Sequence, residues 1–275
     1  METQQIVQSL SYVTWVLLGG LALGSFALTW LLGQVTDATP GFLGFSAVLA
    51  AVIGFGWLMV EWGLPAPSEL AIESGADLDE PRRAAIALFS VVALAAGIRM
   101  RRGGRAMWLG ALALTAGVVA LFIAAWGWGG AEPISVSIFV QLVSLAAVTG
   151  GSMAAVVLAH WYLVTPKISE RPLIITTQLL MLVLIVQLLL FGVWTAAGIP
   201  DLEPFEALTG ENMLFVWLRL VVGLIFPLVL TAMAYRTALT RSMESATGLL
   251  YIEFALVMAS TIVAAGLLFG EGLLV

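Results

Sequence analysis

Cysteine is absent from this chain, and histidine occurs only once. Without thiolates the chain cannot form a disulfide, a cysteine-ligated metal site or a covalently held iron–sulfur cluster. A single histidine also argues against a buried b-type haem, which usually takes two axial ligands, and against a metal site of histidine and carboxylate. We therefore predict no haem and no metal in this chain, so that any redox centre belongs to a ligand or a partner.

Charged residues are also scarce, because they form 10% of the 275 residues whereas hydrophobic residues form 61%. So much apolar surface cannot be hidden in one water-soluble core. Crossing about 30 Å of hydrocarbon takes roughly 20 helical residues. Eight apolar runs are long enough, near residues 7–33, 41–63, 82–100, 105–129, 134–164, 172–199, 212–238 and 245–270. The sequence predicts an all-α integral membrane protein with eight transmembrane helices, all of them retained.

Soluble nucleotide and hydrolase chemistry finds no support, since the chain has no Walker motif, no GxGxxG after a strand and no Ser/His/Asp pattern. Nucleic acid is an implausible partner on charge and location, because the net charge is −6. The lipid bilayer is the partner that the composition predicts.

Basic residues in the short loops predict the orientation, because short cytoplasmic loops are enriched in Lys and Arg. They fall in three alternate loops: Arg99, Arg101, Arg102 and Arg105; Lys167 and Arg171; Arg236 and Arg241. We therefore expect both termini outside, in a plasma membrane of the prokaryotic (inner-membrane) type. The outer loops are acidic, with Glu69, Glu73, Asp77, Asp79 and Glu80 in one and Asp201, Glu203, Glu206 and Glu211 in another. Such loops fit a basic partner, cations or a merely solvated face.

The two halves of the chain repeat each other in order. Gly19–Gly20 and the later Thr29–Trp30–Leu31–Leu32 match Gly150–Gly151 and His160–Trp161–Tyr162–Leu163. Further matches pair Phe55–Gly56 with Phe191–Gly192, Gly63–Leu64–Pro65 with Gly198–Ile199–Pro200, Arg83 with Arg219, and Arg99 with Arg236. This order predicts an internal duplication into two four-helix halves, 1–131 and 132–275, with the same orientation in the membrane. The small residues Gly20, Gly24, Gly150 and Gly151 would let helices approach closely.

Four ionisable residues lie well inside the apolar runs: Glu61, His160, Arg219 and Glu253. Charges at membrane depth are costly and are functional candidates by default. Helix direction places Glu61 and Arg219 near the outer side, where they could pair as part of a ligand site. The alternatives are a purely structural ion pair, or an arginine that snorkels to the headgroups. His160 and Glu253 share the inner half and could relay protons, whereas His160 beside two aromatics could equally be an interfacial anchor.

The segment Trp15-Val16-Leu17-Leu18-Gly19-Gly20-Leu21-Ala22-Leu23-Gly24-Ser25-Phe26 resembles the first helix of NrfD/DmsC-type quinone-interacting membrane subunits, the family of polysulfide reductase and dimethyl sulfoxide reductase anchors. The chain also resembles them in length and in two expected four-helix bundles. The resemblance implies a subunit, not catalytic alone, of a quinone-linked oxidoreductase. It would bind quinone, exchange electrons with an iron–sulfur or cytochrome partner and conduct protons. It assigns no site residue.

A quinone site needs an apolar slot, donors to the quinone oxygens and a titratable group. The outer candidates are Tyr12, Trp15, Glu61, Gln141 and Arg219, and the inner candidates are His160, Tyr162, Gln178, Tyr251 and Glu253. We favour quinone at the outer set and a proton route through His160 and Glu253. The same buried charges would also suit a proton-coupled secondary transporter, or mere packing in a structural scaffold subunit.

Overall fold

A computed structural model describes residues 3–68, 70–73, 75–130, 133–165, 168–198 and 203–275. The expected boundary between the halves at 131/132 lies outside the described residues, as do the loop residues Glu69, Lys167, Ile199, Pro200 and Asp201. Everything below concerns the described part of the chain.

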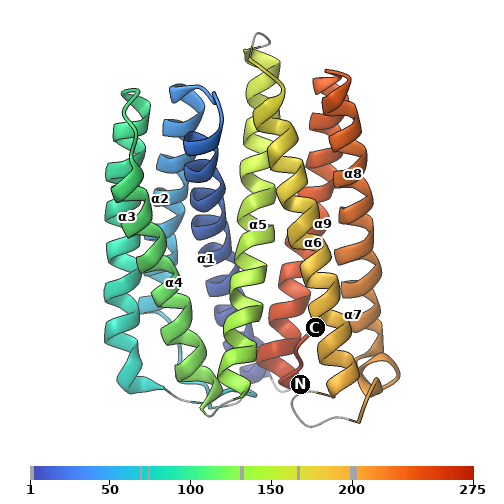
Figure 1. Cartoon of the computed structure of the whole chain (residues 1–275). Helices are drawn as coiled ribbons and strands as arrows, with labels where there is room; N and C mark the ends of the chain where they lie inside the picture. The colour runs from blue at the N-terminus through green and yellow to red at the C-terminus, as the bar shows by residue number, and fades with distance from the viewer. Residues whose placement is uncertain (1–2, 69, 74, 131–132, 166–167, 199–202) are drawn as a thin grey trace.

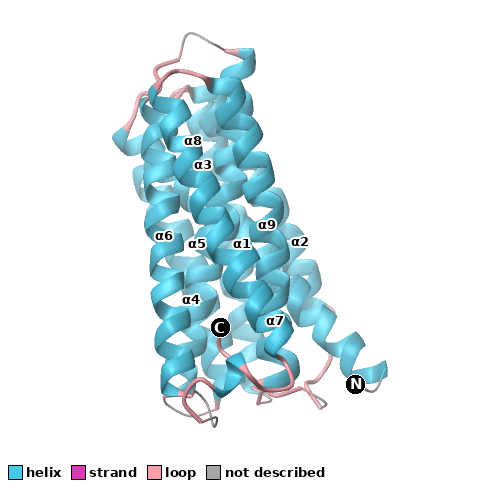
Figure 2. Cartoon of the chain, turned by 90° about the vertical axis from the view of Figure 1, so that its right-hand side faces the viewer, coloured by secondary structure: helices cyan, strands magenta, loops and turns pink. Residues whose placement is uncertain are grey.

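The eight predicted spans are confirmed as helices long and apolar enough to cross a membrane. The first four are α1 (Thr3–Val35), α2 (Pro40–Trp62), α3 (Asp79–Arg101) and α4 (Met107–Gly129); then come α5 (Ile134–Val164), α6 (Arg171–Ala197), a seventh span in three parts, and α9 (Met243–Glu271). Two short 3₁₀ turns, η1 (Ala76–Leu78) and η2 (Glu206–Leu208), lie in the longer connections. The described residues include no strand (Figure 2).

The seventh span changes its helix type partway. It starts as α7 (Met213–Trp217), continues as a π-helical segment η3 (Leu218–Ile225), and returns to α-helix in α8 (Phe226–Leu239). Pro227 explains where the change falls, since proline has no N–H to donate to the carbonyl four residues earlier, at Gly223. A π-helical turn N-terminal to the proline widens the helix there, and such turns often lie at functional sites.

The helices form two groups that meet along α1 and α5. In one group α2 packs on α1 and α3, and α4 packs on α3; in the other α5 packs on α6 and α9, and α8 packs on α6 and α9. Figure 1 shows α2, α3 and α4 on one side and α6, α8 and α9 on the other, with both termini at the same end of the molecule. We call α1–α4 the first helix group and α5–α9 the second helix group.

Glycines allow α1 and α5 to approach closely, as the sequence predicts. A Cβ atom added to Gly24 would collide with the backbone of Ala146, and one added to Gly150 would collide with the backbone around Gly24 and Ser25. Gly151 differs from the prediction, because it faces the side chain of Leu180 in α6. Backbone contact between α1 and α5 therefore joins the two helix groups.

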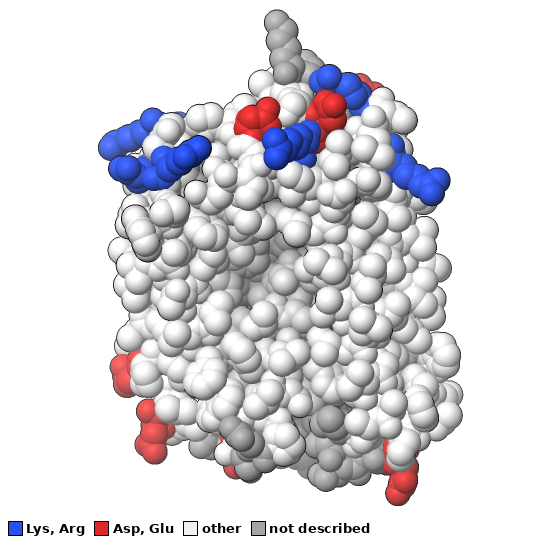
Figure 3. All heavy atoms as spheres, in the orientation of Figure 1, with Lys and Arg blue, Asp and Glu red and all other residues white. Residues whose placement is uncertain are grey.

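Charges separate toward the two ends of the molecule (Figure 3). The end formed by the α3–α4, α5–α6 and α8–α9 connections carries most of the basic residues, and we call it the basic end: Arg99, Arg101, Arg102, Arg105, Arg171, Arg236 and Arg241. The opposite end, the acidic end, holds Glu73, Asp77, Asp79, Glu80, Glu203, Glu206, Glu211 and Glu271. Most of the surface between the ends is uncharged in Figure 3.

Candidate functional site

Glu61 is held in the first helix group near the acidic end. Its carboxylate accepts hydrogen bonds from Trp15 Nε1 at 2.6 Å and from Arg82 Nε at 2.9 Å and Nη2 at 2.8 Å. Arg83 Nε lies 3.8 Å from the same carboxylate. Both Glu61 and Arg82 are buried, and Arg82 Nη2 also donates to Asp79 at 2.8 Å. This arrangement ties α1, α2 and α3 together at one point.

The predicted Glu61–Arg219 pair is therefore wrong. Arg82 and Arg83 lie on the first turn of α3 and reach α2 directly, whereas Arg219 belongs to the second helix group. A carboxylate that accepts bonds from an indole and an arginine, with a second arginine nearby, is held in place by charge-assisted hydrogen bonds. The geometry thus favours the structural ion pair that the sequence left open.

The cavity beside Glu61 is small. It measures about 120 Å³ and is bordered by Tyr12, Arg82, Trp128 and the loop after α2. Tyr12 donates its hydroxyl to the carbonyl of Pro65 at 2.8 Å, so this phenol is already engaged. Ligand sites for drug-sized molecules usually measure about 300–1,000 Å³, whereas a water occupies about 30 Å³. The space suits a few waters rather than a quinone ring.

Arg219 lies in the second helix group, on the π-helical segment η3. Its guanidinium donates to Gln187 Oε1 at 3.2 Å, to Ser260 Oγ, and to the carbonyl of Val275 at 3.4 Å. Gln187 in turn donates to Ser144 Oγ at 3.5 Å. The arginine is 3% exposed, and none of the described Asp or Glu side chains pairs with it. The buried guanidinium is thus held by acceptors from α6, from α9 and from Val275.

An apolar groove opens next to this polar chain. It measures about 410 Å³ and runs between α4, α5 and α6, where its lining residues are Val118, Phe139, Val140, Val143, Ser144, Ala147, Leu182, Val183, Val186 and Leu190. Ser144 is the polar side chain among these lining residues, and it is the acceptor for Gln187. The groove therefore leads from the apolar outer surface of the helices to the Ser144–Gln187–Arg219 chain.

Glu253 is the second buried charge site of this helix group. It is 0% exposed, its Oε1 accepts a hydrogen bond from Ser152 Oγ at 2.7 Å, and its Oε2 has no hydrogen-bond partner among the described residues. Ser152 lies on α5 and Glu253 on α9, so the bond crosses the interface between these helices. Unlike Glu61, this carboxyl has no arginine beside it in the described part of the chain.

His160 and Glu253 make no direct contact in the described structure. His160 is exposed on the side of α5, and its Nδ1 lies 3.5 Å from the hydroxyl of Tyr251, which is 48% exposed. Tyr251 and Glu253 are two residues apart and therefore lie on nearly opposite faces of α9. Sequence depth alone could not reveal this, because an almost uniformly apolar helix does not mark its buried face.

The remaining candidates lie apart from these sites. Gln141 is buried in α5, and neither its Nε2 nor its Oε1 has a partner in the described structure. Tyr162 donates to the carbonyl of Ser169 at 2.5 Å, and Gln178 Nε2 lies 3.5 Å from the hydroxyl of Tyr235. In the His160–Leu163 segment, Trp161 packs against Phe42 of α2. These contacts give this segment a packing role at the basic end.

Several residues that build the sites were missed in the sequence. In the sequence Arg82 stands at the very start of an apolar run, next to an acidic loop, while Gln187, Ser152 and Ser260 are uncharged side chains of kinds common in membrane helices. Their spacing offers one usable signal. Ser144, Val148 and Ser152 are four residues apart and share one face of α5. Glu253, Val257 and Ser260, at spacings of four and three residues, share one face of α9 in the same way. Recognising that signal requires knowing that α5 packs on α9.

Comparisons with protein-family models, curated proteins and solved structures give no significant match to this chain. The geometry of the buried polar sites and of the groove therefore carries the functional argument.

Proposed function

We propose that this chain is the quinone-binding membrane subunit of a respiratory redox complex. The observation that carries the proposal is the groove between α4, α5 and α6, which joins an apolar surface of membrane depth to the polar Ser144–Gln187–Arg219 chain. An isoprenoid quinone has the matching chemistry, since its tail is apolar and its ring carries two carbonyl acceptors. The groove of about 410 Å³ also falls in the range typical of small-molecule sites.

The donors suit a quinone oxygen. Arg219 and Gln187 both carry N–H groups, and both lie behind Ser144 at the groove wall, whose own hydroxyl donates to the carbonyl of Gln141 at 2.9 Å. A fixed positive charge from arginine would stabilise negative charge on a reduced quinone. Of the predicted outer set, this proposal keeps Arg219 as a binding residue, with Gln141 one turn from Ser144, and leaves Tyr12, Trp15 and Glu61 in a structural role.

Electrons must come from another chain, since this chain lacks cysteine and has one histidine. We infer an iron–sulfur or cytochrome partner, in line with the resemblance of residues 15–26 to NrfD/DmsC-type subunits. The acidic end offers a surface for a basic partner by charge complementarity. By the positive-inside rule the basic end faces the cytoplasm of a prokaryotic-type plasma membrane, so that both termini and the partner lie outside.

We further propose that the two helix groups derive from one duplicated unit. Support comes from their contacts, because the first helices of the two halves, α1 and α5, pack on each other, with Gly20 and Gly150 from the two repeated glycine pairs at the contact. The groove would then combine α5 and α6 of the second half with α4 of the first half.

Filling the groove tests the binding site. Val186→Phe adds bulk within the lining, whereas Val193→Phe places the same bulk on an exposed position of α6 outside the lining. In nanodiscs, Trp fluorescence quenching by a short-chain quinone should show about tenfold weaker binding for Val186→Phe, about 1.4 kcal/mol. Equal affinity for both variants, or no binding by the unchanged chain, would contradict the proposal.

A proton-coupled secondary transporter is a second candidate, favoured by one observation. The seventh span departs from α-helix at η3, beside the buried Arg219, and irregular helices at membrane depth often mark transport sites. Substrate uptake by proteoliposomes that contain only this chain would support it, and dependence of any activity on co-purified redox subunits would oppose it.

A further inference from the structure

The interior of the second helix group is layered along the membrane direction. Toward the acidic end lies the polar layer that contains Arg219, Gln187, Ser144 and Ser260. Toward the basic end lies the Ser152–Glu253 pair. On α5 the sequence from one polar layer to the other runs Ser144, Val148, Ser152, and on α9 it runs Ser260, Val257, Glu253. The polar sites are thus about 12 Å apart along α5, at 1.5 Å per residue.

An apolar layer separates the two polar sites. Val148, Leu184 and Val257 are 2%, 0% and 1% exposed and form a small cluster of their own, distinct from the main core, with Val183 and Leu228 packed on it. One residue comes from each of α5, α6 and α9, so the layer closes the interior of the helix group. At its edge the hydroxyls of Thr149 and Thr261 hydrogen-bond at 2.7 Å.

We propose that this interior is a proton-transfer path, with Glu253 as the proton-carrying group and Val148, Leu184 and Val257 as a hydrophobic gate between Glu253 and the Arg219 site. The proposal rests on the proposed function, because the proton's destination is the proposed quinone site. His160, which the sequence suggested as part of the relay, lies on the exposed side of α5 and takes no part.

Glu253 has the surroundings of a group that changes its protonation state. Its carboxyl is fully buried, has a single hydroxyl donor, and leaves Oε2 free of partners in the described structure. An ionised carboxylate in such a place is costly, because neither water nor a cation offsets its charge. Glu61 is the internal contrast, since its carboxylate accepts two hydrogen bonds from Arg82. Among these two buried carboxyls, Glu253 is the one without a cationic partner in the described structure.

The apolar layer explains why such a path would not leak. Apart from the Thr149–Thr261 pair at its edge, the layer is apolar and about one helical turn thick, so it excludes water and blocks proton movement until it hydrates or shifts. The fixed charge of Arg219 on its far side further opposes an excess proton. Leu228 of α8 packs on the layer just beyond the π-helical segment, so a change in the helix type of the seventh span would act directly on the gate.

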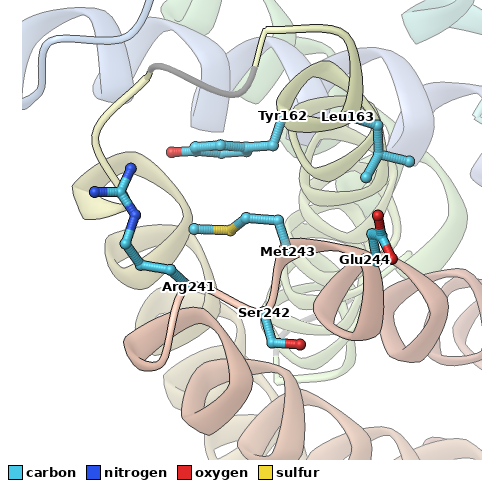
Figure 4. A pocket seen from close by; sticks show the side chains of 6 residues that line it. All are labelled: Tyr162, Leu163, Arg241, Ser242, Met243 and Glu244. Carbon is cyan, nitrogen blue, oxygen red and sulfur yellow. The ribbon is translucent and has the colours of Figure 1, made fainter.

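Open crevices lie over both ends of this helix group. At the basic end a crevice of about 500 Å³ is lined by Tyr162, Leu163, Arg241, Ser242, Met243 and Glu244. Figure 4 shows Tyr162 and Leu163 at the end of α5 near residues 241–244, which span the α8–α9 connection and the start of α9; α5 and α9 are the helices that carry Ser152 and Glu253. Met243 and Glu253 are ten residues apart, or about 15 Å along α9. At the acidic end a second crevice, of about 210 Å³, includes Glu211 and Glu271.

The proton balance is simple. One proton enters from water in the basic-end crevice and binds the Glu253 carboxylate. When the gate opens, this O–H bond breaks and the proton moves to the Ser144–Gln187 site, where it binds an oxygen of the reduced quinone. The electrons that reduce the quinone come from the proposed redox partner. Each quinone reduced to quinol takes two such protons.

Passive proton flux tests the gate without any quinone. Val148→Thr with Val257→Thr keeps side-chain shape but places hydroxyls in the apolar layer, while Val92→Thr makes the same change at a buried position of α3. Each purified chain is reconstituted in liposomes that contain a pH-sensitive dye, and a potassium diffusion potential with valinomycin drives protons inward. We expect flux about tenfold higher for the double variant than for Val92→Thr, because hydrogen bonds in the layer lower the barrier.

Adding Glu253→Gln to the double variant should return the flux to the unchanged level. Should the double variant fail to reconstitute, Val257→Thr alone is measured in the same way. Unchanged flux in the folded gate variants, or increased flux that survives Glu253→Gln, would overturn the proposal. Because no quinone is present, such a failure would leave the groove and its quinone binding untouched, whereas failure of quinone binding would leave the flux result standing.

Discussion

Glu61 is buried among cations, so its main contribution is to the stability of the first helix group. Glu61→Gln removes the negative charge and leaves Arg82 buried without its principal partner. Breaking a buried ion pair from one side typically costs about 3 kcal/mol or more. We therefore expect a clearly lower thermal unfolding temperature in detergent, followed by Trp fluorescence.

The matched control is Glu80→Gln, which removes a carboxylate from an exposed pair with Arg83. Exposed pairs contribute little, so this variant should unfold close to the unchanged protein. Quinone affinity of folded Glu61→Gln should also be unchanged. A loss of quinone binding without a loss of stability would show that Glu61 is a quinone-binding residue.

At the residue scale the sequence identified three of the buried charges, but it missed Arg82 and could not find their partners. Glu61, Arg219 and Glu253 stand out because charge is rare in these apolar segments, and the structure does bury all three. Their partners depend on which helices are neighbours and how each is rotated. Hydropathy shows neither the neighbours of a helix nor its rotation, since lipid-facing and protein-facing positions are equally apolar.

At the scale of elements, the contact between α1 and α5 depends on glycine. Gly24→Val would push its side chain into the backbone of α5 at Ala146. Overpacking of this kind typically costs about 1–3 kcal/mol, and here no flexible side chain can move aside. We expect a lower unfolding temperature and reduced yield of folded protein from membranes.

Gly192→Ala serves as the control, because a Cβ at that position in α6 meets nothing within 4 Å. Replacing a helix-interior glycine by alanine should stabilise the helix by about 0.5–1 kcal/mol. If Gly24→Val were as stable as Gly192→Ala, the close contact of α1 with α5 would be refuted.

Element boundaries could be predicted well, because each span must be long and apolar and is interrupted by charged, glycine or proline residues. The π-helical segment could not be predicted from the sequence. Pro227 signals a disturbance in the seventh span, but proline is equally compatible with a kink or a water-filled gap. The packing of Gly223 against Ser260, together with the bond from Arg219 to Ser260, accompanies the π-helical form here.

At the scale of the whole molecule, the separation of charge predicts orientation. The chain lacks cysteine, so single cysteines can be added at exposed positions without background labelling. Thr209→Cys lies at the acidic end and Ser245→Cys at the basic end. In intact cells or spheroplasts, a membrane-impermeant maleimide should label Thr209→Cys, while Ser245→Cys should react only after lysis. The reverse pattern would contradict the proposed orientation and place the partner on the cytoplasmic side.

Purification from native membranes in mild detergent tests the central claim most directly. The sample would be analysed for co-purifying chains, for extractable quinone and for its optical spectrum. A quinone-binding redox subunit predicts bound quinone together with an iron–sulfur or cytochrome chain. A colourless preparation without partners and without quinone would contradict the account and favour transport.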